Sequence, residues 1–548
     1  MVLKAQQAKA CTLNTGSHVA DDFPADSSEP ATDRPVQSIS LCTIPRVLMY
    51  HQRMESSIIE EHKRLGRAVT DIIVEYARTL DERRVTSEAS PAELEQLFGE
   101  ELPDDGASVD EILTLFTERV VPHAMQIPSP RYYGLFNPTP LPIGVWADAL
   151  ASALNQNGAA WRNSPSASVI ESVVLRWLCQ LVGYGHESFG TLTSGGSESN
   201  LIGLKCARDR AHKDIRDRGV RAAPNGLIVY ASEQSHYSFE KSVDILGLGR
   251  QNLRKVATDD DFHINILALR EAIELDLTQG NTPCCIAGTA GTTSTGVVDP
   301  LDQLADVAQD YDMWFHVDAA YGGALAFSRK HKHCLRGIDR ADSITFDPHK
   351  WMFVPFACGA TLVKGGGRIL REAFDITPEY LSEDRGGADV EYDFFRYGQL
   401  GTRRFNALKV WMAIKHLGVR GYAEIIDRQI ALTHYLASRL DELEDFELVG
   451  NVETAVCCFR FLPDEARSMD NESRDYLQRA LQQRVELSGE VWISTTVLKG
   501  RRALRVNINS FLTERRHVDD LLQLLLRECG MLKSIGDKCR DSAPSELL

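Results

Sequence analysis

The sequence predicts an α/β fold with a large, mainly parallel sheet, helices before the sheet, and a smaller α+β domain after it. The chain has 548 residues, too many for one ordinary domain. Between residues 140 and 365, short apolar runs alternate with helical patterns, as in an open, doubly wound sheet. Hydrophobic residues make up 43% of the chain and charged residues 25%, values typical of a globular protein with a large core.

The segments before the sheet lack a core of their own. Residues 1–45 are rich in Ser, Asp, Pro, Thr and Ala without helical or strand periodicity, so we predict a disordered extension. Residues 46–139 are predicted to be helical, because the stretches 56–79 and 108–125 each place apolar residues on one face. These helices carry too little apolar bulk to fold alone. We expect them to pack on something larger, such as a second subunit.

The large domain, residues 140–400, is predicted from five apolar runs bounded by turn residues, the pattern of buried parallel strands. These runs are 226–232, 284–292, 314–320, 343–347 and 358–364. Residues 168–184 predict a helix, and residues 301–312 predict a crossover helix between two strands. In sheets of this kind, ligands bind beyond the carboxyl ends of the strands.

The rest of the chain mixes helices and strands on a smaller scale. Amphipathic helices are predicted at 407–419 and 517–532, and strands at 455–462 and 503–510. We therefore predict a small α+β domain over residues 401–535, followed by a tail at 536–548.

Charge and cysteine content argue against several classes of partner. The net charge of −17 disfavours nucleic acid and anionic membranes, because both attract clustered Lys and Arg. No apolar run approaches the length of a membrane span, and residues 1–30 lack the apolar core of a secretory signal. The twelve cysteines show no zinc or disulfide spacing, so no metal is predicted and a reducing compartment is favoured. We expect a cytoplasmic protein.

The first polar group at a strand end is the turn of small residues Ser194, Gly195, Gly196 and Ser197. It precedes a helix predicted from Glu198, whose free N–H groups favour an anion such as phosphate. An ordinary N-cap turn explains the same residues equally well. The spacing matches neither a Walker loop nor GxGxxG.

Three further groups follow other strands. Asp318 ends an apolar strand, and a buried carboxylate there requires a charged partner or a strong donor, either a structural Arg or a protonated cofactor ring. His236 follows the strand at 226–232, where a structural role is the commoner one for an isolated histidine. Thr289 ends a third strand among other hydroxyls, where a polar turn would look the same.

The fifth group is Lys350, in the stretch SITFDPHKWMF, with Asp347 and His349 beside it. A surface lysine that happens to follow a strand is one explanation. The other is a partly desolvated amine, which is a nucleophile toward carbonyls.

One cofactor would account for all five groups. An aldehyde that carries a phosphate would bond to Lys350, place its phosphate on the turn before Glu198, and pair its ring nitrogen with Asp318. His236 would stack on the ring. Such a cofactor is pyridoxal phosphate.

The order of these motifs resembles that of a known family. The chain carries TSGGSESN, SEQSHYSFEKS, GTAGTTSTGVVDP, HVDAAYGG and DPHKW. Over residues 55–530 it resembles the group II pyridoxal phosphate-dependent amino-acid decarboxylases, such as the aromatic-amino-acid, glutamate and diaminobutyrate decarboxylases. The resemblance implies fold type I of the pyridoxal phosphate enzymes and the cofactor pyridoxal 5'-phosphate. It also implies a homodimer with shared active sites, in which residues 46–139 form a dimerisation arm.

The resemblance implies a role for each motif residue. Lys350 is the Schiff-base lysine, Asp318 the partner of the pyridinium nitrogen, and His236 the histidine that stacks on the ring. Cofactor contacts are also implied for Gly195, Gly196, Ser197, Thr289, Asp347 and His349.

The implied reaction is decarboxylation of an L-amino acid to the amine and CO2, through an external aldimine and a quinonoid carbanion. In this family a mobile loop brings a tyrosine that protonates the α-carbon, and TPEYL gives Tyr380 at that place. Relatives with phenylalanine there tend to form aldehydes, so Tyr380 favours plain decarboxylation. Decarboxylative aldehyde synthesis, aminotransfer, carbon–carbon bond formation and a non-catalytic homologue remain as alternatives.

The substrate pocket is predicted around residues 129–140. Leu135 and Phe136 are expected to contact the substrate, although Leu135 and Ala159 stand where aromatic-amino-acid decarboxylases carry aromatic side chains. Arg403 matches a region of the family in which an arginine lies close to the site, and we expect it to orient the substrate carboxylate. The identity of the amino acid is left open.

Overall fold

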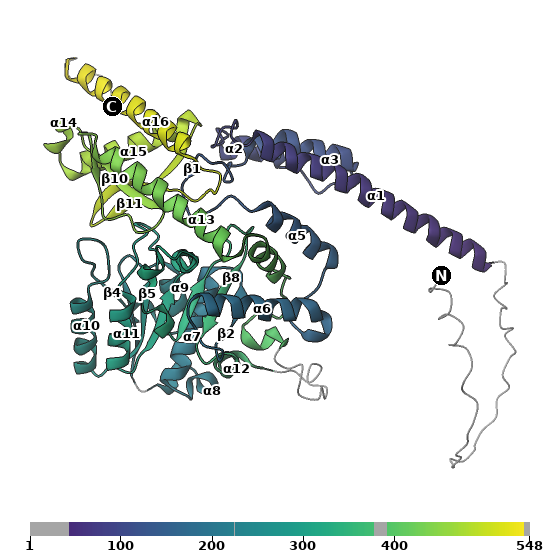
Figure 1. The fold of residues 1–548 in the computed structure, drawn as a ribbon, viewed down its shortest axis with the longest axis horizontal. Helices are drawn as coiled ribbons and strands as arrows, with labels where there is room; N and C mark the ends of the chain where they lie inside the picture. Colours follow the sequence, from purple (N-terminus) through teal and green to yellow (C-terminus); the bar gives the residue numbers. More distant parts are fainter. Residues whose placement is uncertain (1–42, 224, 377–391, 542–548) are drawn as a thin grey trace, which may run out of the picture. The chain divides into compact units, whose positions relative to one another are not determined.

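The computed structural model of the protein describes residues 43–223, 225–376 and 392–541 (Figure 1). The chain divides after Thr70 into two compact units, and the second unit contains both sheets. The first described element is the long helix α1 (Thr43–Thr79). It begins three residues before the predicted helical segment.

A seven-stranded sheet forms the centre of the large domain, in the order β2-β8-β7-β6-β5-β3-β4 (Figure 1). The strands are β2 (Phe189–Thr193), β3 (Leu227–Ser232), β4 (Leu253–Val256), β5 (Thr282–Thr289), β6 (Trp314–Asp318), β7 (Ser343–Phe346) and β8 (Gly359–Val363). All five predicted runs form strands, and β2 and β4 are additional.

The prediction of a mainly parallel sheet is confirmed, with one correction. β3, β4, β5, β6 and β7 pair in parallel with one another, but β8 is antiparallel to both β2 and β7. The expectation that 358–364 is a parallel strand is therefore wrong. A parallel return is usually made through a helix, whereas the described loop 347–358 contains none. That loop carries Lys350.

Helices precede, connect and follow the strands of the large sheet along the chain. They are α5 (Pro142–Leu154), α6 (Pro165–Leu181), α7 (Gly196–Ala211), α8 (Ile215–Arg218), α9 (Ser238–Ile245), α10 (Ile266–Thr278), α11 (Leu301–Asp310) and α12 (Gly367–Phe374). The predicted crossover helix at 301–312 is α11. Helix α7 packs against β5, β6, β7 and β8, which brings its first turn to the carboxyl ends of the strands.

The small domain is built on a five-stranded sheet in the order β1-β11-β12-β10-β9. Its strands are β1 (Tyr132–Tyr133), β9 (Phe446–Leu448), β10 (Val456–Phe461), β11 (Trp492–Leu498) and β12 (Arg501–Asn507). Its helices are α13 (Ala407–Asp441), α14 (Asp464–Arg467), α15 (Asn471–Ser488) and α16 (Arg515–Asp541). β1 pairs in parallel with β11, so the end of the segment predicted as a helical arm supplies an edge strand to this sheet.

Three short helices precede β1 in the second unit: α2 (Pro91–Phe98), α3 (Val109–Leu115) and α4 (Val121–His123). Ser90 and Ser108 begin α2 and α3 with capping boxes that also use Glu93 and Glu111. Neither α2 nor α3 buries any residue. Local caps thus define these helices, while their apolar side chains stay at least partly exposed.

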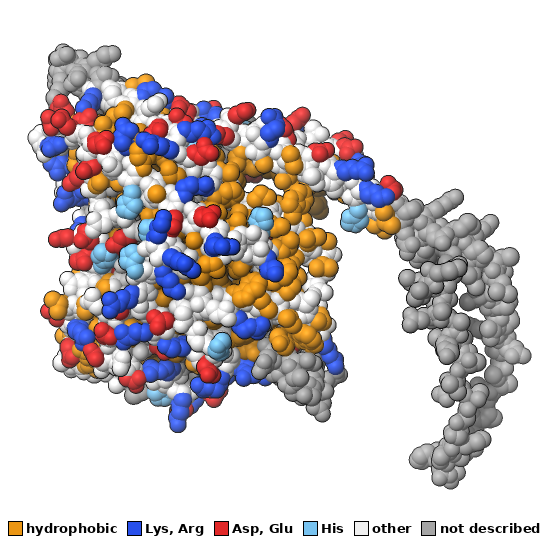
Figure 2. Space-filling view, in the orientation of Figure 1, with side chains coloured by type: hydrophobic (Ala, Val, Ile, Leu, Met, Phe, Trp, Pro, Cys, Tyr) orange, Lys and Arg blue, Asp and Glu red, His pale blue; other side chains and the backbone are white. Residues whose placement is uncertain are grey.

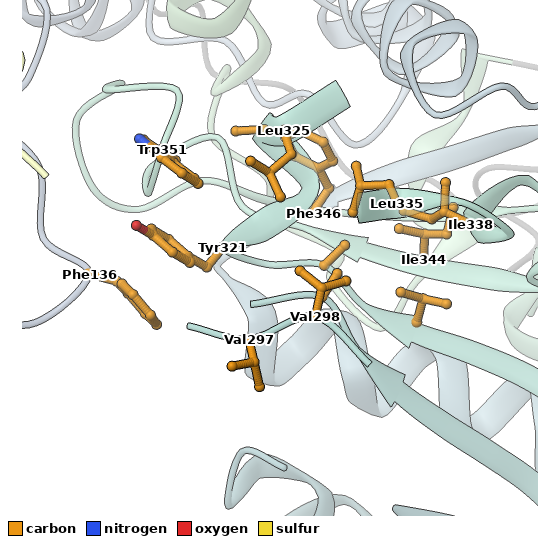
Figure 3. Close-up of a cluster of buried hydrophobic side chains, with 14 of the residues drawn as sticks. Phe136, Val297, Val298, Tyr321, Leu325, Leu335, Ile338, Ile344, Phe346 and Trp351 are labelled. Atoms are coloured by element: carbon orange, nitrogen blue, oxygen red, sulfur yellow. The ribbon is translucent and has the colours of Figure 1, made fainter. Parts of the chain in front are cut away.

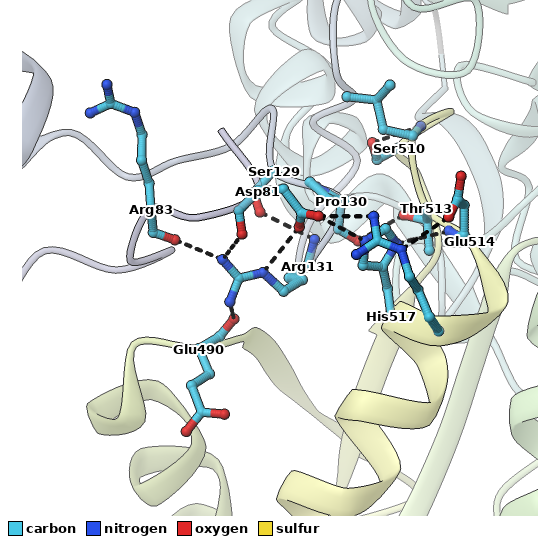
Figure 4. A network of polar contacts seen from close by, with 12 residues as sticks. Asp81, Arg83, Ser129, Pro130, Arg131, Glu490, Ser510, Thr513, Glu514 and His517 are labelled. Carbon is cyan, nitrogen blue, oxygen red and sulfur yellow. Dashed lines mark hydrogen bonds and ion pairs between the residues drawn. The ribbon is translucent and has the colours of Figure 1, made fainter. Parts of the chain in front are cut away.

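A polar network ties the segment that follows α1 to the small domain (Figure 4). The Arg131 guanidinium donates to the backbone oxygens of Asp81, Arg83 and Glu490 at 2.6, 2.8 and 2.8 Å. The Asp81 carboxylate accepts a hydrogen bond from Arg516 at 2.9 Å. Arginine suits this place because its planar fork serves several acceptors at once.

A row of aromatic rings joins the two domains beside the large sheet (Figure 3). The Phe136 ring lies 3.8 Å from the Tyr321 ring, and Tyr321 lies 4.6 Å from the Trp351 ring, both pairs stacked. The Tyr321 hydroxyl donates to Asn507 Oδ1 at 3.0 Å, which ties the row to β12. Phe136 is thereby fixed next to the loop that carries Lys350.

Among the described helices, none combines the length and apolar character needed to cross a bilayer. The described cysteines are all free thiols. Within the same residues, no group of three His, Cys, Asp or Glu side chains is arranged to hold a metal.

Candidate active site

A cavity of about 350 Å3 lies at the carboxyl ends of the central strands, beside the start of α7. The parallel order of β3, β5, β6 and β7 brings the sequence motifs together there. Ten of the predicted site residues line it: Phe136, Gly195, Gly196, Ser197, His236, Thr289, Asp318, Asp347, His349 and Lys350.

The turn before α7 requires glycine because other groups approach it closely. Helix α7 begins at Gly196, two residues earlier than predicted, with Gly195 as its N-cap. A Cβ on Gly195 would lie 3.0 Å from His349 Cε1, and one on Gly196 would lie 2.9 Å from Asp347 Oδ2. Side chains at these positions would fill this end of the cavity.

The same turn offers backbone donors to an anion. The first amide bonded back along the helix is that of Ser199, which donates to Gly195 O at 3.1 Å. Among the described residues, nothing accepts from the N–H groups of Ser197 and Glu198. Ser194 does not pair with these amides, because its N–H and its hydroxyl both donate to Glu198 Oε2, at 2.7 and 2.8 Å. The unpaired amides and the helix dipole favour negative charge at this point.

Lys350 brings an amine into the cavity from the loop after β7. Its Nζ lies 3.1 Å from Asp347 Oδ2 and 5.8 Å from the centroid of the Phe136 ring. Asp347 is buried; its Oδ2 also accepts the Gly196 N–H at 3.0 Å, whereas its Oδ1 has no partner in the described structure. The amine is therefore neither a free surface group nor locked into the core.

Asp318 brings a buried carboxylate to another wall of the cavity. It ends β6, and its Oδ2 accepts a hydrogen bond from Asn200 Nδ2 at 2.8 Å. Its Oδ1 accepts the Ala320 N–H at 3.2 Å. Both donors are neutral, and no arginine or lysine in the described chain forms an ion pair with Asp318. A buried carboxylate in this setting stabilises a cation in the cavity.

Two histidines face the cavity in their neutral form, because burial lowers the pKa of both His236 and His349. His236 Nδ1 lies 2.8 Å from Ser238 Oγ and accepts the Ser238 N–H at 3.2 Å. His349 Nδ1 accepts the Cys358 N–H at 3.0 Å. Each ring is thus held through Nδ1.

Thr289 is held by its backbone, so that its hydroxyl stays unpaired. Its N–H donates to Asp299 Oδ2 at 2.8 Å, and Asp299 Oδ1 accepts the Ile264 N–H at 2.8 Å. Burial raises the pKa of Asp299 to about 6. Thr289 Oγ1 is buried and has no partner among the described residues.

The residues present fit pyridoxal phosphate. Unpaired helix amides suit the phosphate, the Lys350 amine suits the aldehyde, and the Asp318 carboxylate suits a protonated ring nitrogen. Two buried polar atoms on the cavity wall, Thr289 Oγ1 and Asp347 Oδ1, lack partners in the described protein, as expected where a polar ligand belongs.

Comparison with known proteins decides the family. The pyridoxal-dependent decarboxylase conserved domain matches residues 91–462. The chain belongs to the pyridoxal-dependent decarboxylases. It is therefore a carboxy-lyase that works with pyridoxal phosphate, with the fold of type I pyridoxal phosphate enzymes.

Relatives of this decarboxylase cover nearly its whole length. It is 31% identical to an aromatic-L-amino-acid decarboxylase from Bacillus atrophaeus over 88% of this chain and 97% of the relative. It is also 31% identical to a 4-hydroxyphenylacetaldehyde synthase from Rhodiola rosea, over 84% of this chain and 93% of the relative. The crystal structure of Oryza sativa TDC with PLP and tryptamine matches with a TM-score of 0.79 and 29% identity, over 85% of this chain and 97% of that one.

Two residues predicted to bind substrate lie away from the cavity of the decarboxylase. Leu135 is 49% exposed, and its carbonyl accepts a hydrogen bond from Asn507 at 3.0 Å. Arg403 is buried in an ion pair with Glu171, and it also donates to the backbone oxygens of Gly158 and Leu192. Its donors are used to hold segments of the fold together, which argues against the expected contact with a substrate carboxylate. Tyr380 lies outside the described residues.

Arg505 was not singled out in the sequence, yet it is the unusual cation near the cavity. It is 3% exposed, and no carboxylate contacts it among the described residues. Its Nε donates to Ser294 O at 3.1 Å, Nη1 donates to Gly134 O, and Nη2 is unpaired. Its guanidinium lies 4.9 Å from the centroid of the Phe136 ring. The sequence signal for Arg505 was its place two residues before Asn507 in the apolar stretch ALRVNINS. Residues two apart share a strand face, so this spacing predicts two polar side chains on one face of the strand.

Proposed function

We propose that the cavity around Lys350 is the active site in which the decarboxylase converts an L-amino acid to the corresponding amine and CO2. The observation that carries this proposal is the placement of the Lys350 amine and the Asp318 carboxylate in one cavity with the unpaired amides of α7. These three features match the aldehyde, the ring nitrogen and the phosphate of one cofactor.

Each cavity residue has a task that follows from its contacts. When bound, pyridoxal phosphate supplies an aldehyde that reacts with amines and a ring that withdraws electrons from the bonds of the α-carbon. Lys350 provides the amine that holds the cofactor, and Asp347 Oδ2 at 3.1 Å receives or returns its proton. Asp318 stabilises a proton on the ring nitrogen. The first turn of α7, from Gly196, binds the phosphate.

The remaining residues shape the space around the ring. His236, held through Nδ1, contacts the ring, and Thr289 offers its unpaired hydroxyl. His349 and Ser197 lie at the phosphate end. We further propose that Arg505, in place of Arg403, provides the positive charge that attracts a substrate carboxylate.

We also propose a homodimer with shared active sites. Trp146, Leu150 and Leu154 are 38, 52 and 57% exposed, and their spacing of four residues places them along one face of α5. Figure 2 shows hydrophobic side chains gathered where Figure 1 places α5. The exposed apolar side chains of α2 and α3 would be covered in the same assembly. Apolar faces of this kind are typical of subunit interfaces.

A cytoplasmic location is supported by the cysteines. All nine described cysteines are unpaired, and eight of them are buried. Free thiols in this number favour a reducing compartment.

Reduction with borohydride tests the assignment of Lys350. The holoenzyme is expected to lose its visible absorbance on reduction and to carry the cofactor on the peptide containing Lys350, as read by mass spectrometry. Lys350→Ala is expected to lose at least about 1,000-fold in CO2 release, because a covalent anchor is removed. Lys364→Ala, at the end of β8, is the matched control and should retain both properties. Cofactor found on another lysine would overturn the assignment.

Aldehyde formation is the second candidate reaction, because one relative is named as an aldehyde synthase. Incubation with a panel of L-amino acids, with CO2, amine and aldehyde measured together, separates the two reactions. We expect amine and CO2 in equal amounts from the native enzyme. Tyr380→Phe is expected to divert product toward aldehyde and ammonia, with dissolved O2 as the oxidant that is reduced to hydrogen peroxide. An amine-only product from that variant would contradict the role predicted for Tyr380.

A further inference from the structure

Asn200 lies in the cavity wall, in the second turn of α7, and uses its whole hydrogen-bonding capacity. It is 1% exposed. Its Nδ2 donates to Asp318 Oδ2 at 2.8 Å and to Ser238 Oγ at 2.9 Å. Its Oδ1 accepts from Thr345 Oγ1 at 2.7 Å and lies 2.9 Å from His316 Nε2. Two donors and two acceptor sites are all that an amide side chain has.

The direction of this network is fixed at its Asp318 end. The Trp314 indole can only donate, and it donates to Ser343 Oγ at 2.8 Å. Ser343 Oγ lies 2.7 Å from His316 Nδ1, and its hydroxyl can donate there while it accepts from the indole. At the other end, an ionised Asp318 can only accept. The Asn200 amide therefore has one orientation, with its N–H groups toward the cavity.

Asn200 also donates to the serine whose hydroxyl lies beside His236 Nδ1. Because Ser238 Oγ accepts from Asn200, its own hydroxyl proton is free to go to His236 Nδ1, 2.8 Å away. The Ser238 N–H donates to the same nitrogen at 3.2 Å. Nδ1 is thus the acceptor nitrogen, shared between the Ser238 amide and hydroxyl, and the proton of the neutral ring resides on Nε2.

The sequence makes room for this arrangement at Gly203, one turn after Asn200. A Cβ on Gly203 would lie 2.6 Å from His316 Cε1 and Nδ1 and 3.1 Å from Ser343 Oγ. Asn200 and Gly203 are three residues apart and share a face of α7. Glycine there lets the helix approach His316 closely enough for Asn200 to reach it.

We propose that Asn200 is a positioning residue that couples the Asp318 carboxylate to the tautomer of His236. The cavity then meets an acceptor at Asp318 and an N–H donor at His236 Nε2. His236 serves as a hydrogen-bond donor to an oxygen of the cofactor or substrate, and it does not act as a base. This inference rests on the proposed roles of Asp318 and His236.

Two readouts test the coupling. The first is the ring-nitrogen NMR signals of His236 in 15N-histidine-labelled apoenzyme, assigned by their loss in His236→Asn. The second is the dissociation constant of pyridoxal phosphate, from titration of the apoenzyme. The native apoenzyme should show the Nε2–H tautomer. The first readout does not depend on how the cofactor binds, so it separates this inference from the proposed function, which the borohydride experiment tests.

Asn200→Asp keeps the shape of the side chain and changes the direction of its bonds. Its new oxygen would face Asp318 Oδ2, so the two carboxyl groups must share a proton, and Ser238 would turn its hydroxyl away from His236. We expect the tautomer signals to move and the dissociation constant to rise about tenfold or more, as for a lost hydrogen bond to a charged group. Native tautomer signals or native affinity in this variant would overturn the inference.

Two further variants separate the bond from Asn200 to Asp318 from its bond to Ser238. Ser238→Ala is expected to move the His236 signals while changing cofactor affinity less than about threefold, because it leaves the bond to Asp318 intact. Unchanged signals would overturn the inference even if Asn200→Asp does not fold. Thr345→Val removes a donor from the other side of Asn200 and should leave both readouts native. If it moves both as far as Asn200→Asp, the effect is one of core packing and the inference fails.

Discussion

At the scale of single residues, the site is defined by which polar groups lack partners. Asp318 is buried and accepts hydrogen bonds from neutral donors only. Thr289 Oγ1 and Asp347 Oδ1 are buried and have no hydrogen-bond partner among the described residues. The Arg403 guanidinium, in contrast, already has a partner, because it forms a buried ion pair with Glu171. A ligand is expected where partners are missing, because burying an unpaired polar group is costly.

Asp318→Asn tests the importance of that charge. The variant keeps the shape of the side chain but cannot stabilise a protonated ring nitrogen. Loss of a charged hydrogen-bond partner is expected to weaken cofactor binding at least about tenfold and to lower kcat further. Titration of the apoenzyme and CO2 release measure both. Asp312→Asn, at an exposed turn, is the control, and native values for Asp318→Asn would remove its assigned role.

The protonation of His263 is expected to make the free energy of unfolding depend on pH, and the cofactor plays no part in this effect. Its Nε2 lies 2.7 Å from Glu453 Oε1, and this hydrogen bond, with further attraction from Glu453, Asp259 and Asp299, raises the pKa of His263 to about 9. Because the folded-state pKa exceeds the ordinary value near 6.5, the stabilisation is fully present below about pH 6.5. It is lost as the pH rises through about 9.

We expect the free energy of unfolding to fall by about 1–2 kcal/mol more in the native protein than in His263→Gln between pH 6 and pH 9.5. Urea denaturation at the two pH values measures the difference. Equal losses in the two proteins would show that the His263–Glu453 pair does not contribute.

At the scale of elements, helix α7 connects the phosphate end of the cavity with the residues behind it. Its first turn provides Gly195 and Gly196, and its second turn provides Asn200. The motif TSGGSESN predicted the turn, although the helix begins two residues earlier than expected. The role of Asn200 was missed, because its partners lie on β6, β7 and α9, and no local pattern reports them.

Gly203→Ala tests the close packing of α7. Alanine ordinarily favours a helix over glycine by about 1 kcal/mol, but the added Cβ would lie 2.6 Å from His316. Overpacking costs about 1–3 kcal/mol, so a net loss of stability is expected. Gly530→Ala in α16 is the matched control, because nothing lies within 4 Å of its Cβ position, and it should gain stability. The two changes in denaturation midpoint should have opposite signs.

At the scale of the whole molecule, the two sheets meet around the aromatic row that contains Phe136. Residues 132–133 were predicted within the helical arm but form an edge strand of the small domain. The same segment places Phe136 on the cavity wall and Leu135 outside it. Short stretches with little periodicity take their structure from the neighbour they pair with, so their sequence alone is ambiguous.

The proposed dimer is tested through α5. Leu150→Glu places a charge in the middle of the exposed apolar face, and it is expected to convert a dimer to a monomer because an unpaired charge is costly in an interface. Light scattering coupled to size exclusion measures the mass. Leu267→Glu on α10, where the side chain is 74% exposed, is the control and should leave the mass unchanged. A Leu150→Glu protein of native mass would exclude this face from the interface.

The sequence by itself determined the fold class and the cofactor, and it predicted ten of the residues that line the cavity. That was possible because each of these residues directly follows an apolar strand, and parallel strands end at one edge of the sheet. Only the tertiary structure decided the direction of β8, the burial of Arg403 with Glu171, and the isolation of Arg505. The partners of Asn200 were also decided at that level. These features depend on contacts between segments far apart in the chain and on which donors remain unpaired after folding. A local stretch of sequence contains neither kind of information.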